Sequence, residues 1–173
     1  MAAGEDLELV RAALSGDRRA LDDLVLGTRD QVERYCAYLG SGIEVDDLVQ
    51  ETYVRALRSL PRFEGRSSFR VYLLGIARRV CADAVRAARR RRRLDTLAST
   101  PRPSIGDPAP EISVRILVEG LAPERRDAFV LTQLVGLPYA EAAEVCGVPV
   151  GTIRSRVARA REDLRSALDA AAG

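Results

Sequence analysis

The stretch that decides the fold lies near the end of the chain, where residues 136–161 are GLPYAEAAEVCGVPVGTIRSRVARAR. This stretch predicts a short helix over residues 138–145 and a tight turn at Cys146-Gly147-Val148. A last helix then begins at Pro149 and reaches about Ala170, because proline fits the first position of a helix. A short helix, a glycine turn and a second helix are typical of a helix-turn-helix. The pattern therefore predicts a unit that places its second helix in the major groove of DNA.

The last helix has an apolar and a polar side when its residues are spaced at 100°. The polar side combines arginines with Ser, Thr and small residues, which suits hydrogen bonding to base edges and phosphates. A solvated charged helix in a bundle is the alternative, but it does not explain the glycine turn. We expect the apolar side to face a core, and it comprises Val150, Ile153, Val157, Ala160, Leu164 and Leu168.

The composition indicates an all-α fold and no catalytic site. The 173 residues are 47% hydrophobic and only 5% aromatic, so any core is aliphatic. All 27 basic residues are Arg, which fits a GC-rich genome, and the net charge of +2 by itself indicates no partner. The chain has no His, which excludes imidazole chemistry. With no metal-ligand cluster or phosphate-binding loop in the sequence, we predict no enzyme, no catalytic residue, no metal and no cofactor.

The sequence also predicts a soluble protein with free cysteines. Cys36, Cys81 and Cys146 are far apart and odd in number, so we predict buried free thiols rather than disulfides. Acidic residues at positions 5, 6 and 8 stand where a signal peptide would be apolar. Without an apolar run long enough to span a bilayer, we predict a cytoplasmic protein with no membrane insertion.

Helical periodicity covers the first half of the chain. A helical stretch over residues 6–39 is interrupted at Ser15-Gly16-Asp17, and a third helix is predicted over residues 45–60. Ser67 or Ser68 then caps a long helix that reaches about Arg93. We therefore predict a first helical domain over residues 1–95.

Prolines among Ser, Gly and Asp mark a change of character after this domain, and they predict a flexible linker over residues 96–112. Helices over residues 112–121 and 123–135 then lead to the helix-turn-helix. The prediction is thus an all-α protein of two small helical domains, with the second over residues 113–173.

The helix over residues 46–60 has a polar half in which carboxylates and an amide lie three and four residues from arginines. This pattern allows an ordinary salt-bridged solvent face or a docking surface, and spacing alone does not decide between them. The opposite half is predicted to be buried and comprises Leu48, Val49, Thr52, Tyr53, Ala56, Leu57 and Leu60.

In the following loop and helix, the residues at core spacing are Phe69, Tyr72, Leu73, Ile76 and Val80. Phe63 is placed outside this stripe, in the loop. The helix ends in a block of arginines, from position 86 to position 93. These fit both the negative end of the helix dipole and a nucleic-acid contact.

Three of these strings resemble the extracytoplasmic-function sigma factors of bacterial RNA polymerase. Residues 136–161 look like region 4, residues 46–57 look like region 2.2, and residues 63–79 resemble regions 2.3 and 2.4. The resemblance implies a region 2 domain, a region 4 domain and a sigma factor that directs core polymerase to promoters. The alternative is a helix-turn-helix regulator that does not dock on polymerase, and the string at 46–57 argues against it.

The resemblance also implies roles for individual residues. Polymerase contacts to the β′ clamp helices would come from Asp47, Gln50, Glu51, Val54 and Arg55, with the β flap as a further contact of the protein. Contacts to the −10 element of promoter DNA would come from Phe63, Ser67, Ser68, Arg78, Arg79 and Arg86. Contacts to the −35 element would come from Thr152, Arg154, Ser155, Arg156 and Arg159.

The sequence departs from the family pattern at two of these places. Arg79 stands where many members have Asn, which replaces a donor and an acceptor by donors alone. Tyr72 replaces the usual Trp in the same hydrophobic role. The family further includes members with an anti-sigma partner, so such a partner is an expectation here as well.

Overall fold

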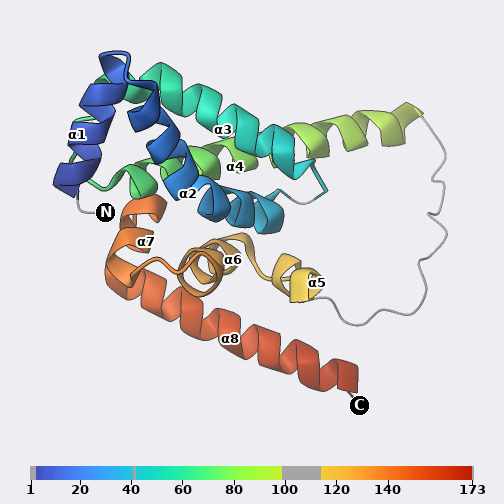
Figure 1. Ribbon diagram of the computed structural model, residues 1–173. Coiled ribbons are helices and arrows are strands. Elements are labelled where there is room, and N and C mark those ends of the chain that lie inside the picture. The colour runs from blue at the N-terminus through green and yellow to red at the C-terminus, as the bar shows by residue number, and fades with distance from the viewer. Residues whose placement is uncertain (1–2, 41, 99–113, 173) are drawn as a thin grey trace.

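The computed structural model describes residues 3–40, 42–98 and 114–172, and these residues contain helices and no β-strand. An N-terminal unit precedes a C-terminal unit, and the two lie against each other (Figure 1). The N-terminal unit consists of α1 (Ala3–Leu14), α2 (Arg18–Leu39), α3 (Val45–Ser59), a 3₁₀ turn (Leu60–Arg62) and α4 (Phe69–Ala98). The C-terminal unit consists of α5 (Val114–Glu119), α6 (Pro123–Phe129), a π-helical turn (Val130–Leu134), α7 (Tyr139–Cys146) and α8 (Val150–Ala172).

The predicted break between the first two helices is confirmed. Gly16 adopts a positive φ of 99°, a conformation that side chains with a Cβ rarely accept. Asp17 then caps α2, because its carboxylate accepts hydrogen bonds from the backbone N–H groups of Arg19 and Ala20 at 2.9 and 3.4 Å. A glycine and a capping aspartate thus end one helix and begin the next.

The core of the N-terminal unit forms around α4, which contacts α1, α2 and α3. The predicted stripe is confirmed, since Phe69, Leu73, Ile76 and Val80 are buried and Tyr72 is half-buried. Each buried side chain of this size stabilises the fold by about 1.5–3 kcal/mol relative to its exposed state. Among the described residues this core is mostly aliphatic, as the composition predicted, and Tyr35 and Phe69 are its buried aromatic residues.

Leu57 corrects the prediction for α3, because its side chain is 42% exposed. The helix packs through Leu48, Val49, Thr52 and Ala56, which are all buried. Leu57 follows Ala56 by 100° around the helix and so falls beyond the edge of this contact. The periodicity identified the correct side of α3 but made the buried strip too wide.

In the C-terminal unit, α8 packs on α6 and α7 through the predicted apolar side. Ile153, Val157 and Ala160 are fully buried, whereas Val150 and Leu164 are half-buried. Leu168 is 49% exposed, so its predicted core position is wrong. The end of α8 extends past the other helices of the unit, which leaves its last turns without a packing partner among the described residues (Figure 1).

Helix α4 is longer than predicted. It ends at Ala98, beyond the predicted helix end at about Arg93. No proline or glycine occurs between Arg93 and Ala98, so nothing in the sequence stops the helix there. The rest of the predicted linker, residues 99–112, lies outside the described residues. Within the described ranges, no helix is both long and apolar enough to cross a membrane.

Helix α4 begins at a cap that involves α1. Ser68 acts as predicted, because its hydroxyl accepts a hydrogen bond from the Val71 N–H at 3.3 Å. A second acceptor comes from far away in the sequence, since the carboxylate of Asp6 accepts the Phe69 N–H at 2.7 Å. Asp6 is only 1% exposed. The start of the longest helix is therefore stabilised by a buried carboxylate on α1.

Replacing Asp6 by Ala removes this acceptor and leaves a buried N–H group without its partner. We expect a loss of about 1–2 kcal/mol in the free energy of unfolding, measured by urea denaturation followed by circular dichroism. Glu8→Ala is the control, because Glu8 is exposed on the same helix and its loss should change stability by less than about 0.5 kcal/mol. Equal losses in the two variants would contradict a capping role for Asp6.

Candidate functional site

The turn between α7 and α8 has the geometry of a helix-turn-helix. Gly147 adopts a left-handed conformation with φ 66° and ψ 38° and ends α7. The following Val148 N–H donates back to the Ala143 carbonyl at 3.1 Å, which closes the turn. A residue with a Cβ at position 147 would be strained by about 1–2 kcal/mol. The predicted glycine turn is therefore required by the backbone.

Helix α8 is held in place from one side and exposed on the other. Ile153 and Val157 are buried, and Arg125 of α6 forms an ion pair with Asp163 of α8 at 2.6 Å. Arg154, Ser155 and Arg159 are exposed on the outer side, and Thr152 and Arg156 are half-buried beside them. The structure thus places all five predicted −35 residues on the first turns of one helix. Their donors suit base edges and phosphates.

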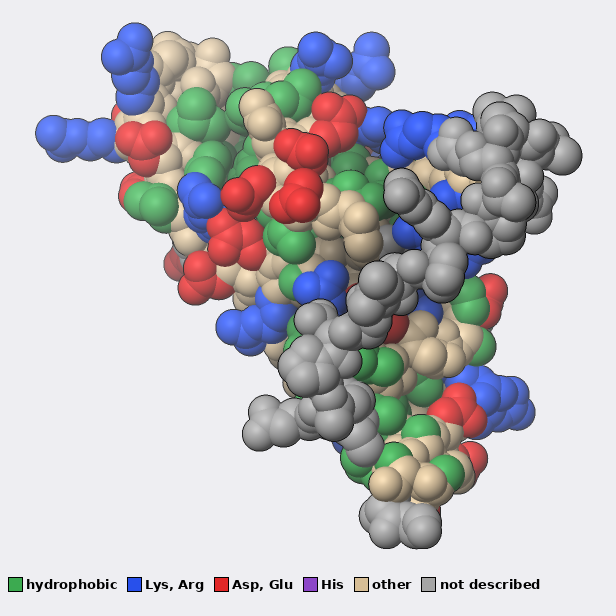
Figure 2. Space-filling model, turned by 90° about the vertical axis from the view of Figure 1, so that its right-hand side faces the viewer, with side chains coloured by type: hydrophobic (Ala, Val, Ile, Leu, Met, Phe, Trp, Pro, Cys, Tyr) green, Lys and Arg blue, Asp and Glu red, His purple; other side chains and the backbone are tan. Residues whose placement is uncertain are grey.

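The predicted polymerase surface lies on α3. Asp47 and Gln50 are exposed, while Glu51, Val54 and Arg55 are half-buried. Figure 2 shows acidic side chains gathered on the N-terminal unit, with arginines at their border.

Within this surface, Arg55 is fixed by two carboxylates. It lies 2.7 Å from Glu51 on its own helix and 2.9 Å from Asp83 on α4. The guanidinium of Arg55, followed by that of Arg86, lowers the pKa of the Asp83 carboxyl. Arg55 therefore holds α3 to α4, and Asp47 and Gln50 form the outward part of the surface.

Phe63 belongs to an aromatic cluster, a contact that its place in the loop did not indicate. Its ring centroid lies 5.1 Å from that of Tyr72 and 6.0 Å from that of Phe69. The Tyr72 hydroxyl is hydrogen-bonded to the Ser59 hydroxyl at 2.5 Å. Edge and tilted arrangements of this kind stabilise aromatic pairs. The half-buried loop residues Ser67 and Ser68 complete the predicted set on this side of the unit.

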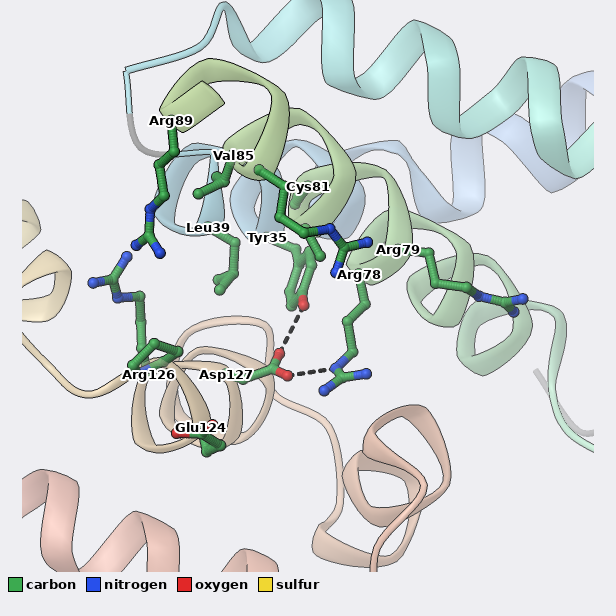
Figure 3. Close-up of a pocket in the computed structure, with 13 residues that line it drawn as sticks. Tyr35, Leu39, Arg78, Arg79, Cys81, Val85, Arg89, Glu124, Arg126 and Asp127 are labelled. Carbon is green, nitrogen blue, oxygen red and sulfur yellow. Dashed lines mark hydrogen bonds and ion pairs between the residues drawn. The ribbon is translucent and has the colours of Figure 1, made fainter. Parts of the chain in front are cut away.

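The two units meet at Asp127 of α6, whose side chain is 5% exposed. One carboxylate oxygen accepts the Tyr35 hydroxyl at 2.7 Å, and the other accepts Nε of Arg78 at 2.5 Å (Figure 3). Burial, together with the charge of Asp127, raises the pKa of Tyr35 well above its usual value. Burial lowers the pKa of Arg78, but its bond to Asp127 outweighs this, so the pKa is raised. Tyr35, Arg78 and Asp127 form what we call the Asp127 cluster.

Further contacts between the units surround this cluster. Arg70 of α4 pairs with Glu141 of α7 at 2.6 Å. Arg34 of α2 donates to the carbonyl of Leu134, at the end of the π-helical turn, at 2.9 Å. A cavity of about 350 Å³ is lined from both units, and its lining includes Ser67, Arg78 and Arg79 together with Glu144, Val145 and Gly147.

Some of the residues predicted to contact the −10 element thus lie against the C-terminal unit. Arg78 is engaged by Asp127, whereas Arg79 is exposed and donates to the Gly75 carbonyl at 3.1 Å. Arg86 lies further along α4 and pairs with Asp83 at 2.5 Å. Asp127 was not predicted as a functional residue, because a lone carboxylate in α6 carries no periodic or motif signal. No group of three or more His, Cys, Asp or Glu among the described residues could hold a metal ion.

A helix-turn-helix unit joined to a helical unit with an exposed acidic helix is the organisation of a sigma subunit of bacterial RNA polymerase. Comparison with known proteins agrees, since residues 24–91 match the family described as Sigma-70 region 2 and residues 113–164 match Sigma-70, region 4. The chain is 45% identical over 161 residues to "ECF RNA polymerase sigma factor SigC" of Mycobacterium tuberculosis, a match that covers 90% of this chain and 87% of that protein. The chain belongs to the extracytoplasmic-function (ECF) sigma factor family.

Other relatives support this assignment. RNA polymerase sigma-H factor of Pseudomonas aeruginosa is 31% identical, over 95% of this chain and 94% of its own. Among solved structures, CnrH in complex with the cytosolic domain of CnrY superposes with a TM-score of 0.74 at 31% identity, covering 95% of this chain and 97% of CnrH. RpoE in complex with the anti-sigma factor NepR from Bartonella quintana gives a TM-score of 0.67 at 27% identity, covering 86% and 95%. The protein therefore directs RNA polymerase to promoters, and the alternative of a conventional regulator falls away.

Asp127→Asn tests whether the Asp127 cluster holds the two units together. The amide keeps the size of the side chain but removes the charge opposite Arg78, and the loss of a hydrogen bond between charged groups costs about 1.5–3 kcal/mol. We expect the units to separate, so that the radius of gyration measured by small-angle X-ray scattering rises by several Å above the roughly 16 Å of a compact chain.

Asp163→Asn is the matched control, because it breaks an arginine–aspartate pair inside the C-terminal unit. This variant should keep the radius of gyration of the unchanged chain. If Asp127→Asn also remains compact, the cluster does not hold the units together.

Proposed function

We propose that the protein grips a promoter at two points. The N-terminal unit, residues 1–95, docks on core polymerase and opens the −10 element, and the C-terminal unit, residues 113–173, recognises the −35 element. This division of roles is supported by the exposed side chains of the two units, which are acidic and amide groups on α3 but arginines on α8. Asp47 and Gln50 are exposed on α3, and Arg154 and Arg159 are exposed on α8. The linker between the units would then thread the polymerase.

At the −35 element, α8 would lie in the major groove with its first turns toward the bases. Arg154 and Arg159 can each donate two parallel hydrogen bonds to a guanine edge or to a phosphate. Ser155 donates its own hydroxyl to the Thr152 carbonyl at 2.9 Å, which leaves its oxygen as an acceptor toward DNA. Arg156, which is half-buried at the edge of the helix, is suited to a backbone phosphate.

At the −10 element, the loop before α4 would capture a base that leaves the double helix. Unstacking a base costs a few kcal/mol, and a pocket that stacks and hydrogen-bonds the base offsets this cost. The half-buried Phe63 would offer its ring for stacking, and the hydroxyls of Ser67 and Ser68 offer donors and acceptors. Arg78, Arg79 and Arg86 follow on one helix and would neutralise the phosphates of the captured strand.

Polymerase docking would use the outward part of α3. Asp47, Gln50 and Glu51 provide carboxylates and an amide for a basic partner surface such as the β′ clamp helices, and Val54 provides an apolar contact beside Arg55. The helix-turn-helix unit would contact the β flap. These contacts make the protein a binding subunit without chemistry of its own, acting in the cytoplasm where the polymerase is. A cognate anti-sigma factor is proposed on the model of CnrH and RpoE.

The contact between the units has a direct consequence for promoter binding. The two elements are about 25 base pairs apart, which is roughly 85 Å at ~3.4 Å per base pair. In this structure, Arg78 and Arg79 line the same cavity as Gly147, three residues before α8 begins. Surfaces so close together cannot bind both elements at once. We infer that the units separate when the protein engages a promoter with polymerase.

Transcription in vitro with core polymerase tests the −35 assignment. Arg159→Ala should reduce promoter-specific transcription by about tenfold or more, the equivalent of 1–3 kcal/mol for a lost base contact. Binding to core polymerase should be unchanged in the same preparation. Arg165→Ala, which changes an exposed arginine six residues further along α8, is the control. Equal loss of transcription and polymerase binding would contradict a role of Arg159 in DNA recognition.

The polymerase surface is tested by charge reversal. Asp47→Arg should weaken binding to core polymerase by at least tenfold, because a repulsive charge replaces an attractive one at the docking surface. Co-purification or fluorescence anisotropy measures this loss. Asp22→Arg, at an exposed position on α2, is the control. Unchanged binding of Asp47→Arg would remove α3 from the proposed interface.

A further inference from the structure

Two of the three cysteines lie in contact in the core of the N-terminal unit. The Cys81 thiol of α4 donates to the Cys36 sulfur of α2 at 3.8 Å, and both residues are buried. They are 45 residues apart in the sequence, and the packing of α2 against α4 brings them together. All three cysteines are free, and Cys146 lies apart from this pair, next to Asp127.

The two thiols point toward each other, which a disulfide requires. A disulfide bond is about 2.05 Å long, so the two sulfur atoms must approach by roughly 2 Å to form one. Rotation of the two side chains about their Cα–Cβ bonds covers part of this distance. Buried side chains stay close to staggered rotamers, so the rest of the approach has to come from a shift of α2 against α4.

A small oxidant can reach the pair from one side. Cys81 lines a cavity of about 410 Å³ between α4 and α6, together with Tyr35 and Arg78 (Figure 3). A water molecule occupies about 30 Å³, and hydrogen peroxide is only slightly larger, so the cavity admits it. Cys36 is fully buried and does not line this cavity. The Cys81 sulfur is therefore the first to meet the oxidant, and the Cys36 sulfur is the second.

The reactivity of the pair depends on the contact between the units. The hydrogen bond to Cys36, followed by burial, raises the pKa of the Cys81 thiol, and the charge of Asp127 on α6 acts in the same direction. Because a thiol reacts with peroxide as its thiolate, a raised pKa slows the reaction. Separation of the units takes away the Asp127 charge and the α6 wall of the cavity, so the Cys81 thiol becomes more reactive.

The pair also lies next to the residues that hold the two units together. Cys36 directly follows Tyr35 on α2, and Cys81 comes three residues after Arg78 on α4. Tyr35 and Arg78 bond to Asp127 at 2.7 and 2.5 Å. Hydrogen bonds of this kind weaken steeply when their atoms move apart by about 0.5 Å or more. A crosslink that draws α2 and α4 together at these positions therefore disturbs both partners of Asp127.

We propose that Cys36 and Cys81 are a peroxide-sensitive pair whose disulfide weakens the contact between the two units. The Cys81 sulfur first attacks hydrogen peroxide: an S–O bond forms, the O–O bond breaks, and water leaves, which gives a sulfenic acid. The Cys36 sulfur then attacks the Cys81 sulfur, so that an S–S bond forms and the S–O bond breaks. The hydroxyl group leaves as water with the Cys36 proton. The two thiols together lose two electrons, and hydrogen peroxide gains them.

The two halves of this coupling agree in direction. Separation of the units makes Cys81 more reactive, and the disulfide in turn favours separation, as reciprocal linkage requires. Oxidised protein is thus the form closer to promoter binding. Only this last consequence rests on the proposed function, because neither the disulfide nor the separation of the units involves polymerase or DNA.

Mass spectrometry of the full chain after exposure to hydrogen peroxide tests the pair. The remaining thiols are alkylated under denaturing conditions. We expect one alkylated cysteine, Cys146, and a pair of peptides linked through Cys36 and Cys81. Dithiothreitol should reverse the link and restore three alkylated cysteines. Cys146→Ala should form the same link, whereas Cys36→Ser should not.

The coupling to the contact between the units is tested in the same preparations. The link should form about threefold faster or more in Asp127→Asn than in the unchanged chain, because Cys81 is then uncovered. Asp163→Asn, which breaks an ion pair inside the C-terminal unit, is the control and should react like the unchanged chain. Small-angle X-ray scattering should show a radius of gyration several Å larger for the oxidised than for the reduced chain. Cys36→Ser treated with peroxide should show no such increase.

Three results would overturn the proposal: no link between Cys36 and Cys81 after peroxide, a predominant link that includes Cys146, or the same radius of gyration for the oxidised and the reduced chain. Each of these results leaves the transcription and polymerase-binding tests unaffected, so failure here is distinct from failure of the sigma-factor assignments.

Discussion

The buried carboxylate of Asp127 is the constraint on which the arrangement of the two units depends. It belongs to the C-terminal unit, but the hydroxyl and the guanidinium bonded to it belong to Tyr35 and Arg78 of the N-terminal unit. Within its own unit, the Cys146 thiol approaches it at 3.7 Å, and burial with the charge of Asp127 raises the pKa of that thiol to about 12. A buried carboxylate without such partners costs several kcal/mol. The Asp127 carboxylate is therefore hydrogen-bonded either in this contact or to water. This favours two distinct arrangements of the units, one in contact and one apart, over a continuous range between them.

The contact between the units leaves two of the three proposed functional surfaces exposed and engages the third. The outward parts of α3 and α8 are exposed, whereas Arg78 is engaged by Asp127 and shares a cavity wall with α7. While the two units lie against each other, the proposed polymerase and −35 surfaces are exposed and the proposed −10 surface is partly covered. Polymerase can thus reach its docking helix first, and binding energy gained there can offset the loss of the Asp127 cluster.

The features predictable from the sequence were those that repeat or mark helix ends. Periodicity located the buried side of α4 and of most of α8, and glycine and proline located the turns at Gly16 and Gly147. Contacts between residues far apart in the sequence, such as Asp6 with Phe69 or Asp127 with Tyr35, have no such pattern and were missed. Leu57 and Leu168 were wrong because periodicity gives the direction of a side chain but not how far the neighbouring helix extends. The predicted site residues share this limit, since their proposed roles follow from family resemblance, whereas the contact of Arg78 with Asp127 does not.

The π-helical turn at Val130–Leu134 places a wider loop of backbone between α6 and the helix-turn-helix, with the Val135 N–H donating to the Val130 carbonyl at 2.8 Å. Such a turn contains one residue more than the α-helical path and is costly to maintain. Loss of one residue there would restore a regular helix and rotate everything downstream by about 100° relative to Asp127. The orientation of α7 and α8 thus depends on the number of residues in Val130–Leu134, independently of which residues they are. An insertion or a deletion there would disturb either the contact between the units or the orientation of α7 and α8.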